Sequence, residues 1–140
     1  GVARSFYIAN AADCLRLEAH SFSMGQMAVA KSILSACRLA EHPAVEECEK
    51  ENAVLVSAAN GVVGQVLAQL LARKGFWVYA VVRWTSDPSA AKLIKGLQQL
   101  SDRVRVLVSG AADGEETLLQ QINRLKLLKP RIAFDGVGGQ

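Results

Sequence analysis

The chain has 140 residues, of which 51% are hydrophobic and 21% are charged, and its formal net charge is +3. A chain of this length supports one hydrophobic core, or part of one, rather than two complete domains. No stretch approaches the roughly 18 uninterrupted apolar residues of a membrane span, the first residues lack the apolar block of a secretory signal, and the basic residues are scattered. We therefore expect no membrane partner, no secretion and no nucleic-acid binding.

The beginning of the chain shows little hydrophobic periodicity. Residues 1–22 are predicted to be an irregular lead-in from a preceding domain. Short extended pieces are expected at Ser5–Ala9 and Leu15–Leu17. The remaining residues, 23–140, form the predicted nucleotide-binding domain, for which the evidence follows below.

A helix is predicted to open that domain. Apolar residues three and four apart indicate a helix from Met24 to about Leu39, and Ser23 and Gln26 have the spacing of a capping box. The segment that follows, His42–Asn52, is polar and acidic. We expect it to be a surface connection into the first strand.

The rest of the chain alternates short β-branched runs with longer amphipathic stretches. The predicted strands are Ala53–Ser57, Trp77–Val82, Val104–Val108 and Arg131–Asp135. The predicted helices are Gly61–Lys74, Pro88–Gln99 and Glu115–Leu128. This alternation predicts an α/β fold with a doubly wound parallel sheet, in the strand order 3-2-1-4 of an incomplete Rossmann fold.

Several helix ends carry recognisable capping chemistry. Asp87 precedes Pro88, which predicts an N-cap followed by a proline at the first helical position. Asp113 and Glu116 have capping-box spacing. Gly75 is expected to close the helix that begins near Gly61.

A glycine-containing turn follows the first predicted strand. Ala59 to Gly64 reads AxGxxG, the dinucleotide-binding pattern with alanine at its first position. A side chain at Gly61 would obstruct a diphosphate, and one at Gly64 would hold the helix away from the strand. Asn60, Val62 and Val63 complete this candidate cofactor-binding turn. The alternative is a tight structural turn without a ligand.

The second predicted strand ends in Arg83, 19 residues beyond Gly64. Enzymes that select NAD usually carry an acid at this point, which binds the ribose hydroxyls. An arginine can instead donate charge-assisted hydrogen bonds to a 2′-phosphate, so NADPH is the favoured cofactor. Trp84 follows in a loop that could face the adenosine. The alternative is a solvated arginine at a strand end.

Three glycines follow the fourth predicted strand. Ligands of doubly wound sheets bind beyond the carboxyl ends of the strands at the switch point, here between the first and fourth strands. Gly138 and Gly139 are therefore candidates for contact with the nicotinamide ribose. The alternative is a flexible end of the chain.

Cysteines give no indication of a metal site. Cys14, Cys37 and Cys48 fit neither a CxxC pair nor an even disulfide framework. We expect free thiols and no metal ligands.

The segments Ser57–Gln65, Arg83 and Phe134–Gly139 resemble the cofactor domain of the medium-chain dehydrogenase/reductase superfamily. The resemblance is to the zinc-free branch, which contains enoyl thioester reductases and quinone oxidoreductases. The positions that match the enoyl reductases of mitochondrial fatty-acid synthesis are Asn60, Val63, Gly64, Gln65, Arg83, Val137, Gly138 and Gly139. Gly61-Val62 and Asp135-Gly136 depart from those reductases, and the second departure is more common in quinone oxidoreductases.

The resemblance covers about Leu17 to Gln140. It implies that a barrel-like catalytic domain with a proton-donating tyrosine, and the last two strands of the sheet, are not part of this chain. No catalytic residue is therefore expected here, and Tyr79 is predicted to be a packing residue. The fourth strand would be an open edge, which favours a homo-oligomer or a longer polypeptide.

Four possibilities remain open, and the last of them is a doubly wound domain that binds no ligand and whose glycine turn is only structural. The first is the NADPH-binding domain of a reductase that acts on the activated double bond of an enoyl thioester, a small-molecule substrate. The second is an NADPH-dependent quinone oxidoreductase, and the third is a dinucleotide-binding module without chemistry. The resemblance implies a mitochondrial location, with the cytoplasm as the alternative, and the chain alone is expected to bind cofactor without turnover.

Overall fold

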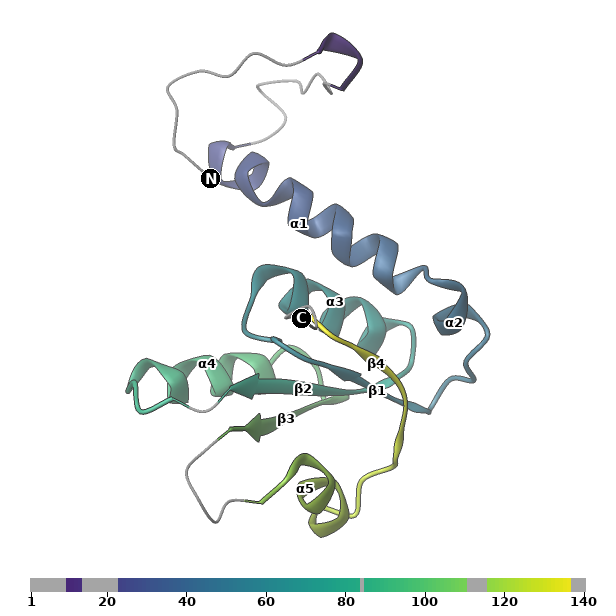
Figure 1. Ribbon diagram of the computed structural model, residues 1–140, viewed down its shortest axis with the longest axis vertical. Coiled ribbons are helices and arrows are strands. Elements are labelled where there is room, and N and C mark those ends of the chain that lie inside the picture. Colours follow the sequence, from purple (N-terminus) through teal and green to yellow (C-terminus); the bar gives the residue numbers. More distant parts are fainter. Residues whose placement is uncertain (1–9, 14–22, 84, 111–115, 137–140) are drawn as a thin grey trace. The chain divides into compact units, whose positions relative to one another are not determined.

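The computed structural model describes residues 10–13, 23–83, 85–110 and 116–136. These residues form the helices and strands that are labelled in Figure 1. The chain divides into two compact units, Gly1–Ala30 and Lys31–Gln140. The second unit contains the sheet.

The described part of the first unit holds a short 3-10 turn, η1 (Ala11–Asp13), and the beginning of α1 (Met24–Ala40). The backbone N–H of Gln26 donates to Ser23 Oγ at 3.2 Å, and the N–H of Ser23 donates to Gln26 Oε1 at 2.8 Å. The predicted capping box is therefore confirmed. The extended pieces expected at Ser5–Ala9 and Leu15–Leu17 lie outside the described residues.

The predicted surface connection His42–Asn52 is mostly exposed and leads into the first strand, but it also contains a short helix, α2 (Pro43–Glu46), that the sequence did not predict. His42 Nδ1 accepts the N–H of Ala44 at 3.2 Å, and proline occupies the first helical turn. Val45 is fully buried and anchors this turn in the core. An imidazole cap and a single apolar residue are weak sequence signals, which is why the helix was missed.

Four parallel strands form the sheet in the order β3-β2-β1-β4, which confirms the predicted fold class. The strands are β1 (Ala53–Val56), β2 (Trp77–Arg83), β3 (Val104–Ser109) and β4 (Pro130–Phe134). Each end of each strand agrees with the predicted end to within one residue. The pairing of β1 with β4 contains one irregularity, because Ala53 lies opposite Pro130 and Val54 lies opposite Ile132, so that Arg131 is an extra residue.

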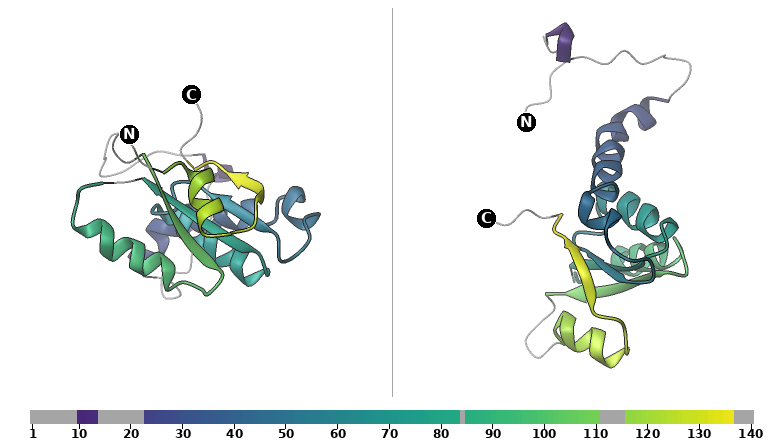
Figure 2. Two further views of the ribbon diagram at one scale, coloured as in Figure 1. Left: turned by 90° about the horizontal axis from the view of Figure 1, so that it is seen from below. Right: turned by 90° about the vertical axis from the view of Figure 1, so that its right-hand side faces the viewer.

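Helices cover both faces of the sheet (Figures 1 and 2). On one face, α3 (Val62–Arg73), α4 (Ser89–Gln98) and the end of α1 enclose the larger apolar cluster, which includes the fully buried Ala36, Val54 and Leu71. On the other face, α5 (Leu118–Arg124) packs through Ile122 onto β2 and β3. Each large side chain buried in this way contributes about 1.5–3 kcal/mol to stability.

Gly75 ends α3 as predicted. Its φ is 99°, its N–H donates to the carbonyl of Ala72 at 3.0 Å, and the N–H of Phe76 donates to the carbonyl of Leu71 at 3.2 Å. This pair of bonds is the Schellman motif, which requires a left-handed residue after the helix. The chain is thereby directed from α3 into β2.

The helix predicted at Glu115–Leu128 is shorter in the structure, where α5 spans Leu118–Arg124. Thr117 is its cap, in a capping box with Gln120, whereas the carboxylate of Glu116 pairs with Arg124. The predicted partner Asp113 lies outside the described residues. At the other end Lys126 takes a φ of 51° and closes the helix in a position that usually holds glycine.

Candidate functional site

The turn between β1 and α3 lies at the carboxyl edge of the sheet. Ala58 has a φ of 48°, in the left-handed region that residues with a side chain seldom enter. The N–H of Ala59 donates to the carbonyl of Val81 at 3.0 Å, and the N–H of Gly61 donates to the carbonyl of Ala58 at 3.0 Å. The first bond ties the turn to β2, and the second closes the turn just before α3 begins.

Gly64 is required by the fold. A Cβ at this position would lie 2.6 Å from the carbonyl oxygen of Ala58 and 2.7 Å from the Cα of Ala59. Both neighbours are backbone atoms that cannot move without displacing the turn. The close approach of helix and strand that the sequence pattern predicts at Gly64 is therefore present.

Gly61 is not required by the fold in the same way. A Cβ there would meet only the carbonyl oxygen of Ala58, at an ordinary contact distance of 3.5 Å. Gly61 is the N-cap of α3 and supplies no side-chain cap to the first amides of the helix. The packing of the chain thus leaves open space above this backbone, which a ligand with phosphate oxygens could fill.

Two cavities flank the turn. The first, here named the switch-point cavity, has a volume of about 400 Å³ and lies between the turn, the end of β4 and α1, which contributes Ser32 and Leu39. Its lining includes Ser57, Gly61, Val62, Val63, Gly64, Phe134, Asp135 and Gly136. It occupies the place where strand order reverses, which is the ligand-binding position of doubly wound sheets.

The second cavity, here named the β2-end cavity, also has a volume of about 400 Å³. Asn60 of the turn and Arg83 of β2 both line it, together with residues from the loop before α4. The two cavities therefore share the turn between them, as the two halves of a dinucleotide site would.

Arg83 is the last residue of β2 and its side chain is exposed. Its register partner is Ser109 at the end of β3. No hydrogen bond or ion pair joins its guanidinium group to any residue that the structure describes. A cation that lines a cavity and has no partner among these described residues can pair with an anionic ligand.

Asp87 shares the β2-end cavity with Arg83 but is directed to the start of α4. Its Oδ1 accepts the N–H of Ser89 at 2.8 Å, and this hydrogen bond lowers the pKa of the carboxyl group. The predicted N-cap at Asp87 is one residue off, because Pro88 is the N-cap of α4 and Ser89 its first residue, although the Asp87 side chain still accepts a backbone N–H at the start of the helix. Its negative charge offsets the dipole of α4.

The structure places the predicted site residues in three groups. Gly61, Val62, Val63 and Gly64 line the switch-point cavity, and Asn60 and Arg83 line the β2-end cavity. Ala59 is fully buried beneath the turn and lines neither cavity. Trp84, Gly138 and Gly139 lie outside the described residues.

Ser57 and Asp135 were not singled out from the sequence. Ser57 Oγ donates to Asp135 Oδ1 at 2.8 Å, and both residues line the switch-point cavity. The available signal was that each follows directly after a predicted strand or ends it. Because the first and fourth strands are neighbours, polar residues at their carboxyl ends must meet.

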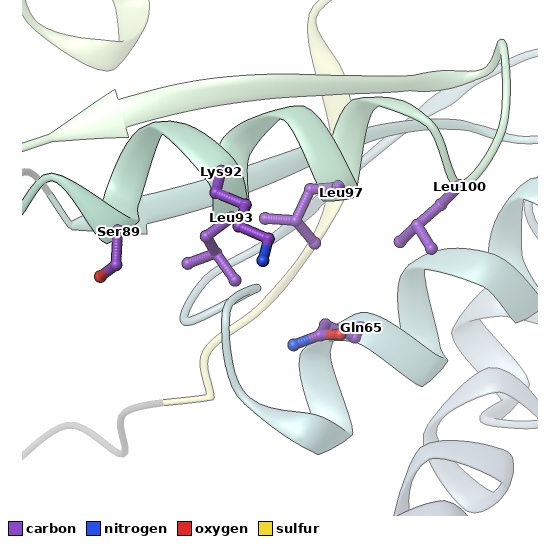
Figure 3. Close-up of a pocket in the computed structure, with 7 residues that line it drawn as sticks. Gln65, Ser89, Lys92, Leu93, Leu97 and Leu100 are labelled. Carbon is purple, nitrogen blue, oxygen red and sulfur yellow. The ribbon is translucent and has the colours of Figure 1, made fainter.

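A groove of about 480 Å³ separates α3 from α4 (Figure 3). Leu93, Leu97 and Leu100 form its apolar side, and Gln65 of α3 faces them across the groove. The Gln65 amide donates to the carbonyl of Asn60 at 2.8 Å and so links the first turn of α3 to the turn that precedes it. None of the residues predicted to bind cofactor lines this groove.

The described cysteines and Tyr79 form no metal site and no second cofactor site. Cys37 and Cys48 are free and half-buried, and among the described residues no group of three potential ligands is placed to hold a metal ion. Tyr79 is a packing residue, as predicted: it is buried, and its hydroxyl donates to the carbonyl of Leu128 at 2.7 Å. Burial raises the pKa of this phenol. Within the same part of the chain, no helix is long and apolar enough to cross a membrane.

Comparisons with known proteins agree with this fold. No family model matches the chain, and no curated protein matches it. The chain is similar in structure to the CurK enoyl reductase, with a TM-score of 0.59 and 19% sequence identity over 87% of this chain. It is also similar to AibC, with a TM-score of 0.54 and 22% identity over 75% of this chain.

A mycobacterial quinone oxidoreductase is a further structural neighbour, with a TM-score of 0.51 and 27% identity over 78% of this chain. The chain spans 33% of the CurK enoyl reductase, 28% of AibC and 30% of the quinone oxidoreductase. The neighbours thus include an enoyl reductase and a quinone oxidoreductase, and they match the resemblance to part of a medium-chain dehydrogenase/reductase enzyme.

Proposed function

We propose that the chain is the NADPH-binding domain of a reductase that acts on the activated double bond of an enoyl thioester. The observation that carries the proposal is the position of Arg83 and Asn60, which line one cavity at the end of β2 beside the turn that begins α3. The oxidoreductases among the structural neighbours support it.

The backbone of the turn and the side chain of Arg83 would together hold the dinucleotide. The backbone of Gly61 to Gly64 would hold the diphosphate, since α3 begins there and a Cβ at Gly61 meets no more than one ordinary contact. Arg83 would hold the 2′-phosphate, and Asn60 would line the adenosine side of the same cavity. When bound, NADPH supplies the hydride of the reduction. Gly138 and Gly139 remain proposed contacts of the nicotinamide ribose.

A second candidate is an NADPH-dependent quinone oxidoreductase. Asp135-Gly136 is the specific observation that favours it, because this pair is more common in that group, and a quinone oxidoreductase is among the structural neighbours. NADPH oxidation by the whole protein with a long-chain enoyl thioester, compared with a small quinone, separates the two activities. A dinucleotide-binding module would oxidise NADPH with neither.

Titration of the 140-residue chain with NADPH and NADH, followed by nucleotide fluorescence or calorimetry, tests the binding step. NADPH is expected to bind at least about tenfold more tightly, which corresponds to about 1.4 kcal/mol. Adenosine 2′-phosphate should compete with NADPH, because it carries the group assigned to Arg83. Failure to bind either nucleotide contradicts the proposal. We also propose a small-molecule substrate, a homo-oligomer and, from the resemblance alone, a mitochondrial location.

A further inference from the structure

One side chain joins the two turns that border the switch-point cavity. Ser57 Oγ donates to Asp135 Oδ1 and accepts the backbone N–H of Gly136, both at 2.8 Å. The backbone N–H of Ser57 also donates to the carbonyl of Phe134 at 2.9 Å. A single residue after β1 thus contacts three successive residues at the end of β4.

The two turns are also in close steric contact. A Cβ at Gly136 would lie 3.0 Å from the carbonyl oxygen of Ser57 and 3.3 Å from the Cβ of Ala58. Ala58 is the residue with the left-handed backbone, so its Cβ is held where β4 ends. Only glycine fits at position 136 without a shift of one turn against the other.

These hydrogen bonds contribute little to the stability of the fold, because the residues that make them are not buried. Asp135 and Gly136 are exposed and Ser57 is half-buried, so water could satisfy the same groups if the turns separated. A hydrogen bond that replaces one to water adds only about 0.5–1.5 kcal/mol to stability. The effect that is specific to this arrangement is geometric, since it sets the separation between the two turns that border the cavity.

We infer that Ser57 is a positioning residue, which holds the turn after β4 against the diphosphate-binding turn and so fixes the width of the cleft that receives the nicotinamide half of the cofactor. This inference rests on the proposed function. The adenosine half lies with the β2-end cavity, whose lining does not include Ser57. Loss of the Ser57 hydroxyl should therefore affect a complete dinucleotide more than a ligand that reaches only the β2-end cavity.

The test compares two ligands on the 140-residue chain. With Ser57→Ala, the Kd for NADPH is expected to rise about tenfold, because the turn after β4 is no longer held in place and must be ordered when the cofactor binds. The Kd for adenosine 2′-phosphate should stay within about twofold, because Ser57 does not line the β2-end cavity. Ser57→Thr, which keeps the hydroxyl, should restore NADPH binding.

Ser101→Ala is the matched control. Ser101 Oγ accepts the N–H of Arg103 at 3.2 Å and lines neither cavity, so its removal also costs a side-chain hydrogen bond. Ser101→Ala should leave the ratio of the two affinities unchanged, and only Ser57→Ala should change it.

The other outcomes contradict either the positioning role of Ser57 or the proposed function. If wild-type protein binds NADPH and Ser57→Ala leaves the ratio of the two affinities unchanged, the positioning role is wrong and the proposed function stands. An alanine effect that Ser57→Thr does not reverse also counts against the hydroxyl. If the wild-type chain binds neither ligand, the proposed function fails, and the inference fails with it.

Discussion

The side chain of Gln121 completes the outer edge of β3 by pairing with Val108. Gln121 Oε1 accepts the N–H of Val108 at 3.1 Å, and its Nε2 donates to the carbonyl of the same residue at 2.6 Å. One amide from α5 therefore satisfies a donor and an acceptor that a neighbouring strand would otherwise bind. β3 is an edge strand in the described sheet, and unpaired edges promote association.

Gln121→Ala should destabilise the domain. Loss of both bonds leaves two half-buried backbone groups without a protein partner, with an expected cost of about 1–3 kcal/mol in the free energy of unfolding. Urea denaturation measures it. Gln98→Ala, at an exposed position of α4, is the control and should stay within about 0.5 kcal/mol of wild type. Equal losses in both variants would contradict a special role for Gln121.

Gly64→Ala and Gly96→Ala should have opposite effects. The added methyl group at position 64 meets backbone atoms at 2.6 and 2.7 Å, so we expect a loss of about 1–3 kcal/mol or more. At position 96, within α4, it meets nothing within 4 Å, so the higher helix propensity of alanine should add about 0.5–1 kcal/mol. Thermal and urea unfolding of both variants check the signs. Stabilisation by alanine at position 64 would show that the turn is not closely packed there.

Arg83→Ala should weaken NADPH binding by about tenfold or more while NADH binding changes little, because only NADPH carries the phosphate assigned to this side chain. Arg73→Ala is the control, since Arg73 is also exposed but lies at the far end of α3. Calorimetric titration of both variants with both nucleotides measures the effect. An equal loss of both nucleotides in Arg83→Ala contradicts the assignment.

Acid should destabilise the chain partly through Glu51. Arg103 donates to both carboxylate oxygens of Glu51, at 2.8 and 3.0 Å, and these bonds lower the pKa of the carboxyl group below its ordinary value of 4.5. A lowered pKa in the folded state stabilises the fold above the unfolded value, and this contribution is lost as the pH falls through the folded value. A hydrogen bond from Lys74 lowers the pKa of Glu46 in the same direction.

Glu51→Gln should therefore have a lower melting temperature than wild type at neutral pH and should approach it below about pH 4. Salt at about 1 M should shrink the difference, because the pair is exposed to solvent. Glu41→Gln, at the exposed residue that follows α1, is the control for the change in net charge. A difference that persists unchanged into acid would assign the effect to packing.

Much of the fold could be predicted because the strands are short, β-branched and separated by amphipathic stretches, so the alternation alone indicated a parallel sheet. The bounds of α5 could not be predicted, because Lys126 ends the helix in a left-handed backbone conformation that is usual for glycine and rare for lysine. α2 was missed because it depends on a histidine cap and on one buried valine. Local sequence is a poor guide where tertiary contacts decide.

The candidate site was predicted in part for a similar reason. The need for glycine at position 64 follows from local geometry, and Arg83 follows from counting along the chain. Ser57 and Asp135 lie 78 residues apart, and their hydrogen bond exists only because β1 and β4 are adjacent. Such a contact becomes visible once the strand order is combined with the polar residues at each strand end.

The extra residue Arg131, just after Pro130, has a consequence for how the free border of β4 can be used. A bulge and a proline both disfavour pairing with a further strand, so the beginning of β4, at Pro130 and Arg131, is protected from such pairing. The regular ladder begins at Ile132 and ends at Phe134, beside the switch-point cavity. A further strand that pairs with β4 would therefore have to do so beside the switch-point cavity, where it would lie close to a bound nucleotide.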